Sequence, residues 1–207
     1  MTTSAAPTGT APTPDPVPDP LVVEWRPDTA AAVKWNVVGL VLTVLGLVLF
    51  LFPVLAQAGP EGVPVEFGLM DLLVVVVLTT VLMGVHEGIH GIAMLAFRAW
   101  PTFGVMLVGR VVPALYATAA GHRFTRSQYL LIAAAPTVAV SVVGFIACFS
   151  AFGGYLVVPL AVHFGGCVGD GFAFLRTLRE APTTGCEDLR DGIRFYRAAF
   201  SPGPRQA

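Results

Sequence analysis

The chain has 207 residues, of which 55% are hydrophobic and 12% are charged, and its mean hydropathy is +0.75. Soluble domains carry about 25% charged residues, so large surfaces of this chain are expected to face something other than water. The formal net charge is −1, and Lys and Arg are scattered among apolar segments, which argues against a nucleic-acid partner. The three cysteines, Cys148, Cys167 and Cys186, form no C-x-x-C pair, so neither a disulfide framework nor a cysteine zinc site is indicated.

Residues 1–30 are rich in Pro, Thr and Ala with isolated Asp residues. Proline lacks a backbone N–H and fixes φ, so we expect a disordered or extended N-terminal tail here. The tail lacks the basic stretch followed by an apolar core that a secretory signal needs. Within it, the segment from Leu21 to Arg26 fits either an interfacial strand or a membrane-surface anchor through Trp25.

Four apolar stretches follow, each long enough to cross a hydrocarbon core about 30 Å thick. They cover residues 35–58, 69–97, 128–150 and 155–175. Lys34 and Trp35 stand at the entry of the first stretch, and Pro136 predicts a kink in the third. The sequence therefore predicts an all-α membrane protein with about four transmembrane helices.

The segment between the second and third stretches, residues 98–127, is interrupted by Pro and Gly and is too broken for a helix. Its valine-rich part, Val105 to Val112, predicts a small β-hairpin, which at membrane depth must be covered by protein or line a wet cavity. A helix is expected around Cys186 to Phe200 in the charged C-terminal segment. We therefore divide the chain into a Pro-rich tail (1–30), a membrane domain (31–180) and a cytoplasmic C-terminal tail with a short helix (181–207).

The positions of the charged residues predict an orientation. The 98–127 connection contains arginines and no acidic residue, whereas the connection before the second stretch contains acidic residues and no basic one. The positive-inside rule then places both termini and the 98–127 segment in the cytoplasm, in a multi-pass protein of the cell membrane. The residues concerned are Arg98, Arg110, Arg123 and Arg126 on one side and Glu61, Glu66 and Asp71 on the other.

The motif His86-Glu87-Gly88-Ile89-His90 places three polar or ionisable side chains inside the second apolar stretch. Residues four apart share a helix face, so His86 and His90 can present two imidazole nitrogens to one metal ion. This is the H-E-x-x-H arrangement of zinc peptidases, in which the histidines hold zinc and the glutamate is the general base. Alternatively, the histidines are buried polar residues that hydrogen-bond across a bundle, but their spacing beside Glu87 favours the metal site.

A third ligand is needed, because catalytic zinc sites commonly use three protein ligands. Asp170 is the best candidate, since the second and fourth stretches run in the same direction and bring it to the depth of His86 and His90. Ionisable residues inside a membrane are costly and usually functional, although Asp170 has an alternative partner in Arg176. His163, two turns before Asp170, fits an alternative ligand, a partner behind the ligands or an oxyanion-stabilising donor.

Three segments carry a resemblance to a known group. They are His86 to His90, the stretch from Tyr116 through Arg126-Ser127-Gln128-Tyr129 to Ala134-Ala135-Pro136, and Gly166-Cys167-Val168-Gly169-Asp170. Over about residues 35–200 the chain resembles the membrane family of putative zincin peptidases, a domain of unknown function, and is more distantly similar to site-2 intramembrane zinc proteases. The resemblance implies His86, His90 and Asp170 as zinc ligands and Glu87 as the catalytic base.

One departure from the site-2 proteases concerns a residue that polarises the substrate carbonyl. Those proteases usually carry an Asn and a Pro upstream of a Leu-Asp-Gly ligand motif, where this chain has His163 and Gly166. The role of the Asn is then either unfilled or passes to His163.

The sequence thus predicts a membrane-embedded zinc metallopeptidase that acts on membrane-associated substrates, with Zn²⁺ as its cofactor. The expected partners are a membrane protein or peptide substrate and the lipid bilayer. The rival hypothesis is a non-catalytic membrane protein that binds metal or serves as a scaffold. Transport would place polar residues along the whole span, whereas here they cluster at one depth, which favours a fixed site. We expect Cys167 to be a small core residue and His122 to be solvated.

Overall fold

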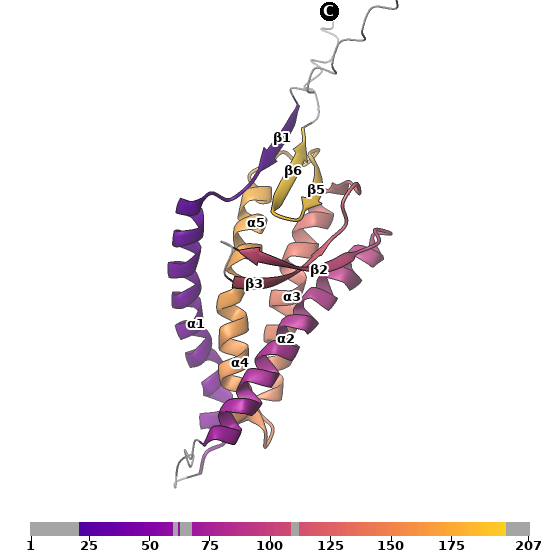
Figure 1. Cartoon of the computed structure of the whole chain (residues 1–207). Helices are drawn as coiled ribbons and strands as arrows, with labels where there is room; N and C mark the ends of the chain where they lie inside the picture. Colours follow the sequence, from indigo (N-terminus) through magenta and orange to yellow (C-terminus); the bar gives the residue numbers. More distant parts are fainter. Residues whose placement is uncertain (1–20, 60–61, 63–67, 109–111, 198–207) are drawn as a thin grey trace, which may run out of the picture.

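The computed structural model describes residues 21–59, 62, 68–108 and 112–197. Within them, helices α1 (Thr29–Gln57), α2 (Leu69–Ala96), α3 (Arg126–Ala147), α4 (Gly153–Gly166) and α5 (Val168–Leu178) form a bundle, with small antiparallel strands at one end and across its side (Figure 1). Helices α4 and α5 meet at Cys167 and together form one apolar segment. Four segments of this part are long and apolar enough to cross a membrane, which confirms the predicted number.

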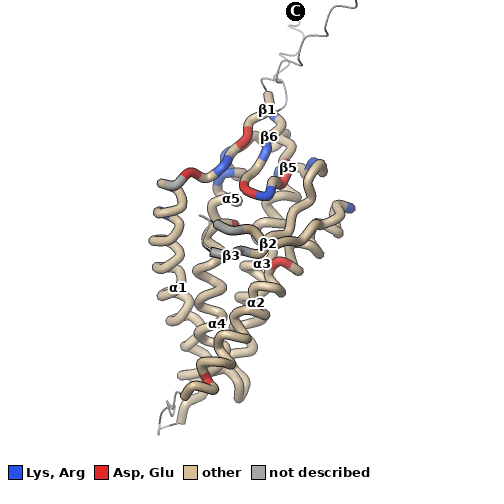
Figure 2. Tube along the Cα trace, in the orientation of Figure 1, with Lys and Arg blue, Asp and Glu red and all other residues tan. Residues whose placement is uncertain are grey.

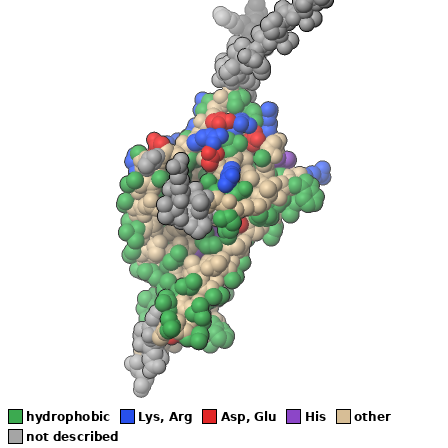
Figure 3. Space-filling view, viewed as in Figure 1, with side chains coloured by type: hydrophobic (Ala, Val, Ile, Leu, Met, Phe, Trp, Pro, Cys, Tyr) green, Lys and Arg blue, Asp and Glu red, His purple; other side chains and the backbone are tan. Residues whose placement is uncertain are grey.

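The surface of the bundle is strongly apolar. Val37, Leu40 and Val48 on α1 are 61%, 67% and 68% exposed, and hydrophobic side chains cover much of the helical part of the molecule (Figure 3). Each such side chain, left exposed to water, would lose the stabilisation of about 1.5–3 kcal/mol that complete burial provides. An exposed apolar surface of this extent fits a membrane protein, in which lipid covers it.

The helices begin where side chains satisfy their first backbone N–H groups. The Asp28 side chain accepts from the Ala31 N–H at 2.7 Å, so α1 starts at Thr29 rather than at the predicted Trp35. At the start of α3, Thr125 and Gln128 bond each other's backbone N–H in a capping box. Such caps stabilise a helix terminus by about 1 kcal/mol, which is why α1 extends beyond its apolar run.

The predicted hairpin between α2 and α3 is confirmed and is longer than expected. Strand β2 (Thr102–Val108) pairs antiparallel with β3 (Val112–Thr118), from Thr102↔Thr118 to Val108↔Val112. The hairpin packs on α2, where the Phe103 ring lies so close to Gly91 that a Cβ there would be 2.5 Å from Phe103 Cζ. The glycine therefore lets the hairpin approach the half of α2 that carries the two histidines.

The helix predicted around residues 186–200 is wrong. Residues Gly185–Leu189 form strand β5 and Gly192–Tyr196 form β6. In β6, Ile193 and Phe195 are at most 1% exposed and alternate with more exposed neighbours, which is the period of a strand. A short segment of mixed apolar and charged residues fits a helix or a strand almost equally well. The strand forms here because neighbouring strands pair with it.

The partners of this hairpin come from both halves of the chain. Strands β1 (Val22–Trp25), β6, β5 and β4 (Phe124–Thr125) form one antiparallel sheet in that order. The strand alternative for the segment near Trp25 is therefore confirmed. Residues 21–30, predicted as the end of a disordered or extended tail, are instead part of the fold, as strand β1 and the start of α1. The rest of that tail, residues 1–20, lies outside the described residues, as does most of the acidic connection before α2. Residues 181–197 of the predicted C-terminal tail are part of the fold, and residues 198–207 lie outside the described residues.

Charged residues gather at the end of the molecule that carries this sheet (Figure 2). Glu24 on β1 pairs with Arg194 on β6, and Glu180 after α5 pairs with Arg176 and Arg197. These ion pairs connect the sheet to its neighbours and to the end of α5. The resulting polar end and apolar bundle agree with the charge asymmetry in the sequence, while the orientation in a membrane stays a prediction.

Helices α1 and α4 approach closely at Gly165, and this contact generates a stability prediction. A Cβ at Gly165 would lie 1.9 Å from Thr43 Oγ1 and 2.5 Å from the Gly39 carbonyl oxygen. Gly165→Ala should therefore push the helices apart and destabilise the protein by about 1–3 kcal/mol. Thermal unfolding in detergent measures the change. The matched control is Gly154→Ala in the same helix, where a Cβ meets nothing within 4 Å; an equal loss in both variants would contradict close packing at Gly165.

Candidate metal centre

The two histidines of the H-E-x-x-H motif lie one turn apart on the inner face of α2. His86 is 5% exposed and His90 is 8% exposed, although most of α2 before them is exposed. Their rings approach edge to face, with centroids 4.8 Å apart. The spacing of four residues thus does what was predicted and directs both imidazoles into the bundle.

Asp170, in the first turn of α5, lies against both histidines. Its Oδ2 is 3.1 Å from His86 Nε2 and its Oδ1 is 3.4 Å from His90 Nε2. Ligand atoms of a tetrahedral zinc site, each about 2.0–2.1 Å from the metal, are separated by about 3.3 Å. The two measured separations are close to this value, and one ligand atom from each of the three residues lies within 4.8 Å of the other two, so the donors suit zinc in type and lie near enough to share one ion. The alternative pairing is not seen, because Arg176 bonds Glu180 instead.

The second nitrogen of each histidine is also occupied. His90 Nδ1 lies 3.0 Å from the Ile132 carbonyl oxygen on α3, which can only accept, so Nδ1 carries the proton and Nε2 is free to bind a metal. His86 Nδ1 lies 3.0 Å from His163 Nε2. A carbonyl or imidazole behind each ligand fixes the orientation of the ring, as is common in zinc sites.

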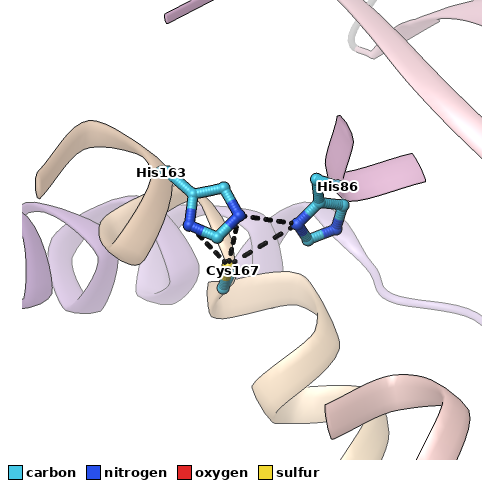
Figure 4. A group of neighbouring side chains, drawn as sticks. All are labelled: His86, His163 and Cys167. Carbon is cyan, nitrogen blue, oxygen red and sulfur yellow. Dashed lines mark hydrogen bonds between the residues drawn. The ribbon is translucent and has the colours of Figure 1, made fainter. Parts of the chain in front are cut away.

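His163 and Cys167 form a second group around His86 (Figure 4). Cys167 Sγ lies 3.8 Å from His86 Nδ1 and 3.7 Å from His163 Nε2, and His163 is 1% exposed. This group meets His86 at Nδ1, whereas Asp170 meets it at Nε2. A neutral imidazole has one nitrogen free to bind a metal, so the two groups exclude each other.

A metal bound by His86, His90 and Asp170 would have a coordination position that water or substrate can reach. The Asp170 side chain is 26% exposed, and it lines two cavities, of about 230 Å³ and 740 Å³. Glu87 lines both of them as well. His163 and Cys167 line neither, so two of the three donors in the other group lie away from both cavities. A catalytic zinc needs a position for water, and only the first group provides one beside a carboxylate.

The smaller cavity contains residues that the sequence did not indicate. The Tyr129 hydroxyl on α3 donates to Asp188 Oδ1 on β5 at 3.0 Å, and both side chains line the cavity with Glu87. Thr118 Oγ1 on β3 donates to the Asp188 carbonyl oxygen at 2.9 Å. Asp188 lies on the same strand face as the fully buried Cys186. If the sequence had been predicted to form a strand here, Asp188 would have been expected to point into the protein.

His122 does not contribute to the site. Its half-buried ring packs on Phe124, with centroids 4.6 Å apart, and it belongs to neither metal group. Fold and site together define a mostly helical protein with membrane-length apolar segments and a buried His-His-Asp group at a cavity junction. The model of the family described as "Putative zincin peptidase" matches residues 79–186, and the chain belongs to this family. No curated protein and no solved structure matches the chain at a significant level.

The family assignment supports a metallopeptidase at the coarse level, and the matched region contains both histidines of the motif, Glu87 and Asp170. It ends two residues before Asp188. The carboxylate that β5 brings to the cavity is therefore a feature outside the matched region.

The buried carboxyl of Asp188 yields a pH prediction. Burial raises its pKa from 3.8 to about 6. In zinc-free protein the Asp188 carboxyl stays protonated up to about pH 6 in the folded state, whereas it loses its proton near pH 4 in the unfolded chain. Asp188 therefore lowers the free energy of unfolding increasingly as the pH rises from 4 to 6, and it has no such effect below pH 4. Asp188→Asn keeps an oxygen for Tyr129 and is neutral at every pH. It should exceed the wild type in stability near pH 7.5 by up to about 3 kcal/mol, and by much less near pH 4.5. Unfolding in detergent at both pH values measures this; a pH-independent difference would contradict it.

Proposed function

We propose that the protein is a membrane-embedded zinc metallopeptidase of the H-E-x-x-H type that hydrolyses peptide bonds of membrane-associated substrates. The observation that carries the proposal is the convergence of His86 Nε2, His90 Nε2 and the Asp170 carboxylate at 3.1 and 3.4 Å, beside Glu87. Two of these ligands come from α2 and one from α5, so the site depends on how two apolar segments pack.

His86, His90 and Asp170 would hold the zinc, and Glu87 would act on the attacking water. When bound there, zinc supplies a Lewis acid that polarises the scissile carbonyl and lowers the pKa of water toward about 7. Glu87 follows His86 directly and lines both cavities, which places its carboxylate where it can take a proton and return it to the leaving amine. His163 would hold the His86 ring from behind rather than polarise the substrate, because its Nε2 faces His86 Nδ1.

The larger cavity offers a path for substrate. Its walls come from α2, α4 and the β2–β3 hairpin and are mainly apolar, and it ends at His86, Glu87 and Asp170. The described hairpin has two strands, so each has an outer edge on which a substrate strand can pair. A helical substrate must unwind first, since its backbone carbonyls are otherwise hydrogen-bonded. The smaller cavity, lined by Glu87, Tyr129 and Asp188, would admit water from the polar end.

The proposal includes the orientation of the protein in the membrane. The site lies near the charged sheet, since Asp188 and Leu189 of β5 line the smaller cavity together with Glu87 and Asp170. The predicted topology places this end of the bundle toward the cytoplasm. Cleavage would then occur near the cytoplasmic face of the cell membrane, with both termini on that side.

Metal content tests the ligand set. Purified wild-type protein should contain zinc, and His86→Ala and Asp170→Ala should lose it on dialysis, because two protein ligands hold catalytic zinc weakly. His122→Ala, a histidine outside the site, is the matched control and should keep zinc. Equal zinc in all four proteins, measured by elemental analysis, would exclude this site.

His163 should affect zinc without being a ligand. His163→Ala removes the group behind His86 and should weaken zinc binding by about 10–100-fold, less than removal of a ligand. Competition with a chelator of known affinity gives the ratio. Zinc affinity equal to that of the wild type would show that His163 does not support the site, and complete loss of zinc would make His163 a ligand.

Glu87 separates the enzyme from the non-catalytic alternative. Glu87→Gln should retain zinc and lower peptide hydrolysis by about 10²–10⁴-fold, because general-base catalysis is lost while the ligands stay. Cleavage of a co-expressed membrane substrate, followed by gel shift, gives the rate. Undiminished cleavage by this variant would exclude Glu87 as the base, and zinc binding without any cleavage by the wild type would favour a scaffold.

A further inference from the structure

A third cavity lies away from the metal centre, between the start of α1, the end of α5 and strand β1. Its volume is about 320 Å³. The structure gives it no part in the site, since it shares no lining residue with the two cavities at Asp170. It combines aromatic, aliphatic and basic side chains, which include Trp25, Trp35, Phe172, Leu175, Lys34 and Arg179.

Aromatic rings form one side of this cavity. Trp35 stacks on Phe172 with centroids 5.3 Å apart, and Trp25 lies 6.1 Å from Trp35. All three rings are partly buried. Tryptophan is typical of the level where a membrane meets water, because its ring is apolar and its N–H seeks a polar partner.

Two cations at this cavity lack an acidic partner. In the described part of the chain, neither Lys34 nor Arg179 forms an ion pair. The neighbouring Arg26 and Arg176 are different, because Arg26 pairs with Glu24 and Asp191 and Arg176 pairs with Glu180. Asp28 also lines the cavity, but one of its carboxylate oxygens caps α1 by accepting from the Ala31 N–H. Lys34 and Arg179 are therefore available to an anion.

The cavity lies where two apolar segments end. The first begins at Ala30 and the fourth ends at Leu178, and both ends meet the cavity. A ligand there has its polar part at the charged sheet and its remaining part beside lipid-exposed side chains such as Leu175, which is 51% exposed. An amphiphile matches this arrangement better than a fully polar anion does.

We propose that this cavity binds the phosphate headgroup of an anionic phospholipid. Lys34 and Arg179 neutralise the phosphate, Trp25 and Trp35 pack on the glycerol region, and the acyl chains leave along Leu175 between α1 and α5. The site joins β1 to the ends of two apolar segments, so its occupancy stabilises the packing of α1 on α5. It does not depend on the proposed hydrolysis.

Lipid binding to the purified full-length protein in detergent tests the proposal, with native mass spectrometry as the readout. The probes are phosphatidylglycerol, phosphatidylcholine with the same chains, and inorganic phosphate. Phosphatidylglycerol should bind the wild type at least about tenfold more tightly than phosphatidylcholine. The double variant Lys34→Gln with Arg179→Gln should weaken phosphatidylglycerol binding about thirtyfold, which is about fivefold for each cation near an anionic lipid. The conservative pair Lys34→Arg with Arg179→Lys should restore most of the affinity, which excludes misfolding as the cause.

The matched control is Arg98→Gln with Arg123→Gln, which removes the same charge outside the cavity and should bind phosphatidylglycerol as the wild type does. Equal weakening in both double variants would overturn the proposal, because the effect would then be one of net charge. Inorganic phosphate that competes at equal concentration would overturn the lipid assignment in favour of a free-phosphate site. Equal affinity for the two lipids would exclude recognition of the headgroup charge.

Discussion

The contact of His86 and His90 with Asp170 is the interaction on which the rest of the structure depends. Ionisable groups inside an apolar bundle cost several kcal/mol unless they are paired, and here two helices share that cost. Nε2 of each histidine faces the carboxylate, and each Nδ1 is held by the Ile132 carbonyl or by His163. This arrangement uses every nitrogen of both rings, and so it fixes α2 against α3, α4 and α5 at one depth.

The polar end of the molecule completes the site that the bundle begins. Strand β5 brings Asp188 into the smaller cavity, where Tyr129 on α3 donates to it. Strand β6 holds β5 in place and is itself paired with β1, so the described N-terminal segment supports a site more than sixty residues away in the sequence. Apolar residues build the scaffold, while strands line the cavities: β2 and β3 border both of them, and β5 borders the smaller one only.

The sequence predicted the parts of this structure that follow from local pattern. Long apolar runs predicted the four segments, the spacing of His86 and His90 predicted their shared face, and the parallel run of two segments predicted Asp170 as their partner. The C-terminal hairpin was missed because a strand of five residues carries little periodic signal and is stabilised by β1, which is far away in sequence. Asp188 and Tyr129 were missed for the same reason, since the contact that makes them notable exists only after the sheet forms. His163 was left between three roles, because no spacing rule shows which nitrogen of His86 it meets.

Two groups of donors share His86, so the proposed zinc site depends on which group binds the metal. X-ray absorption at the zinc edge of the purified protein distinguishes the two groups. We predict nitrogen and oxygen scatterers at about 2.0–2.1 Å, with an imidazole pattern from two histidines and no sulfur. A sulfur scatterer at about 2.3 Å would contradict this prediction, because it would place the metal on His86, His163 and Cys167, of which the last two line neither cavity.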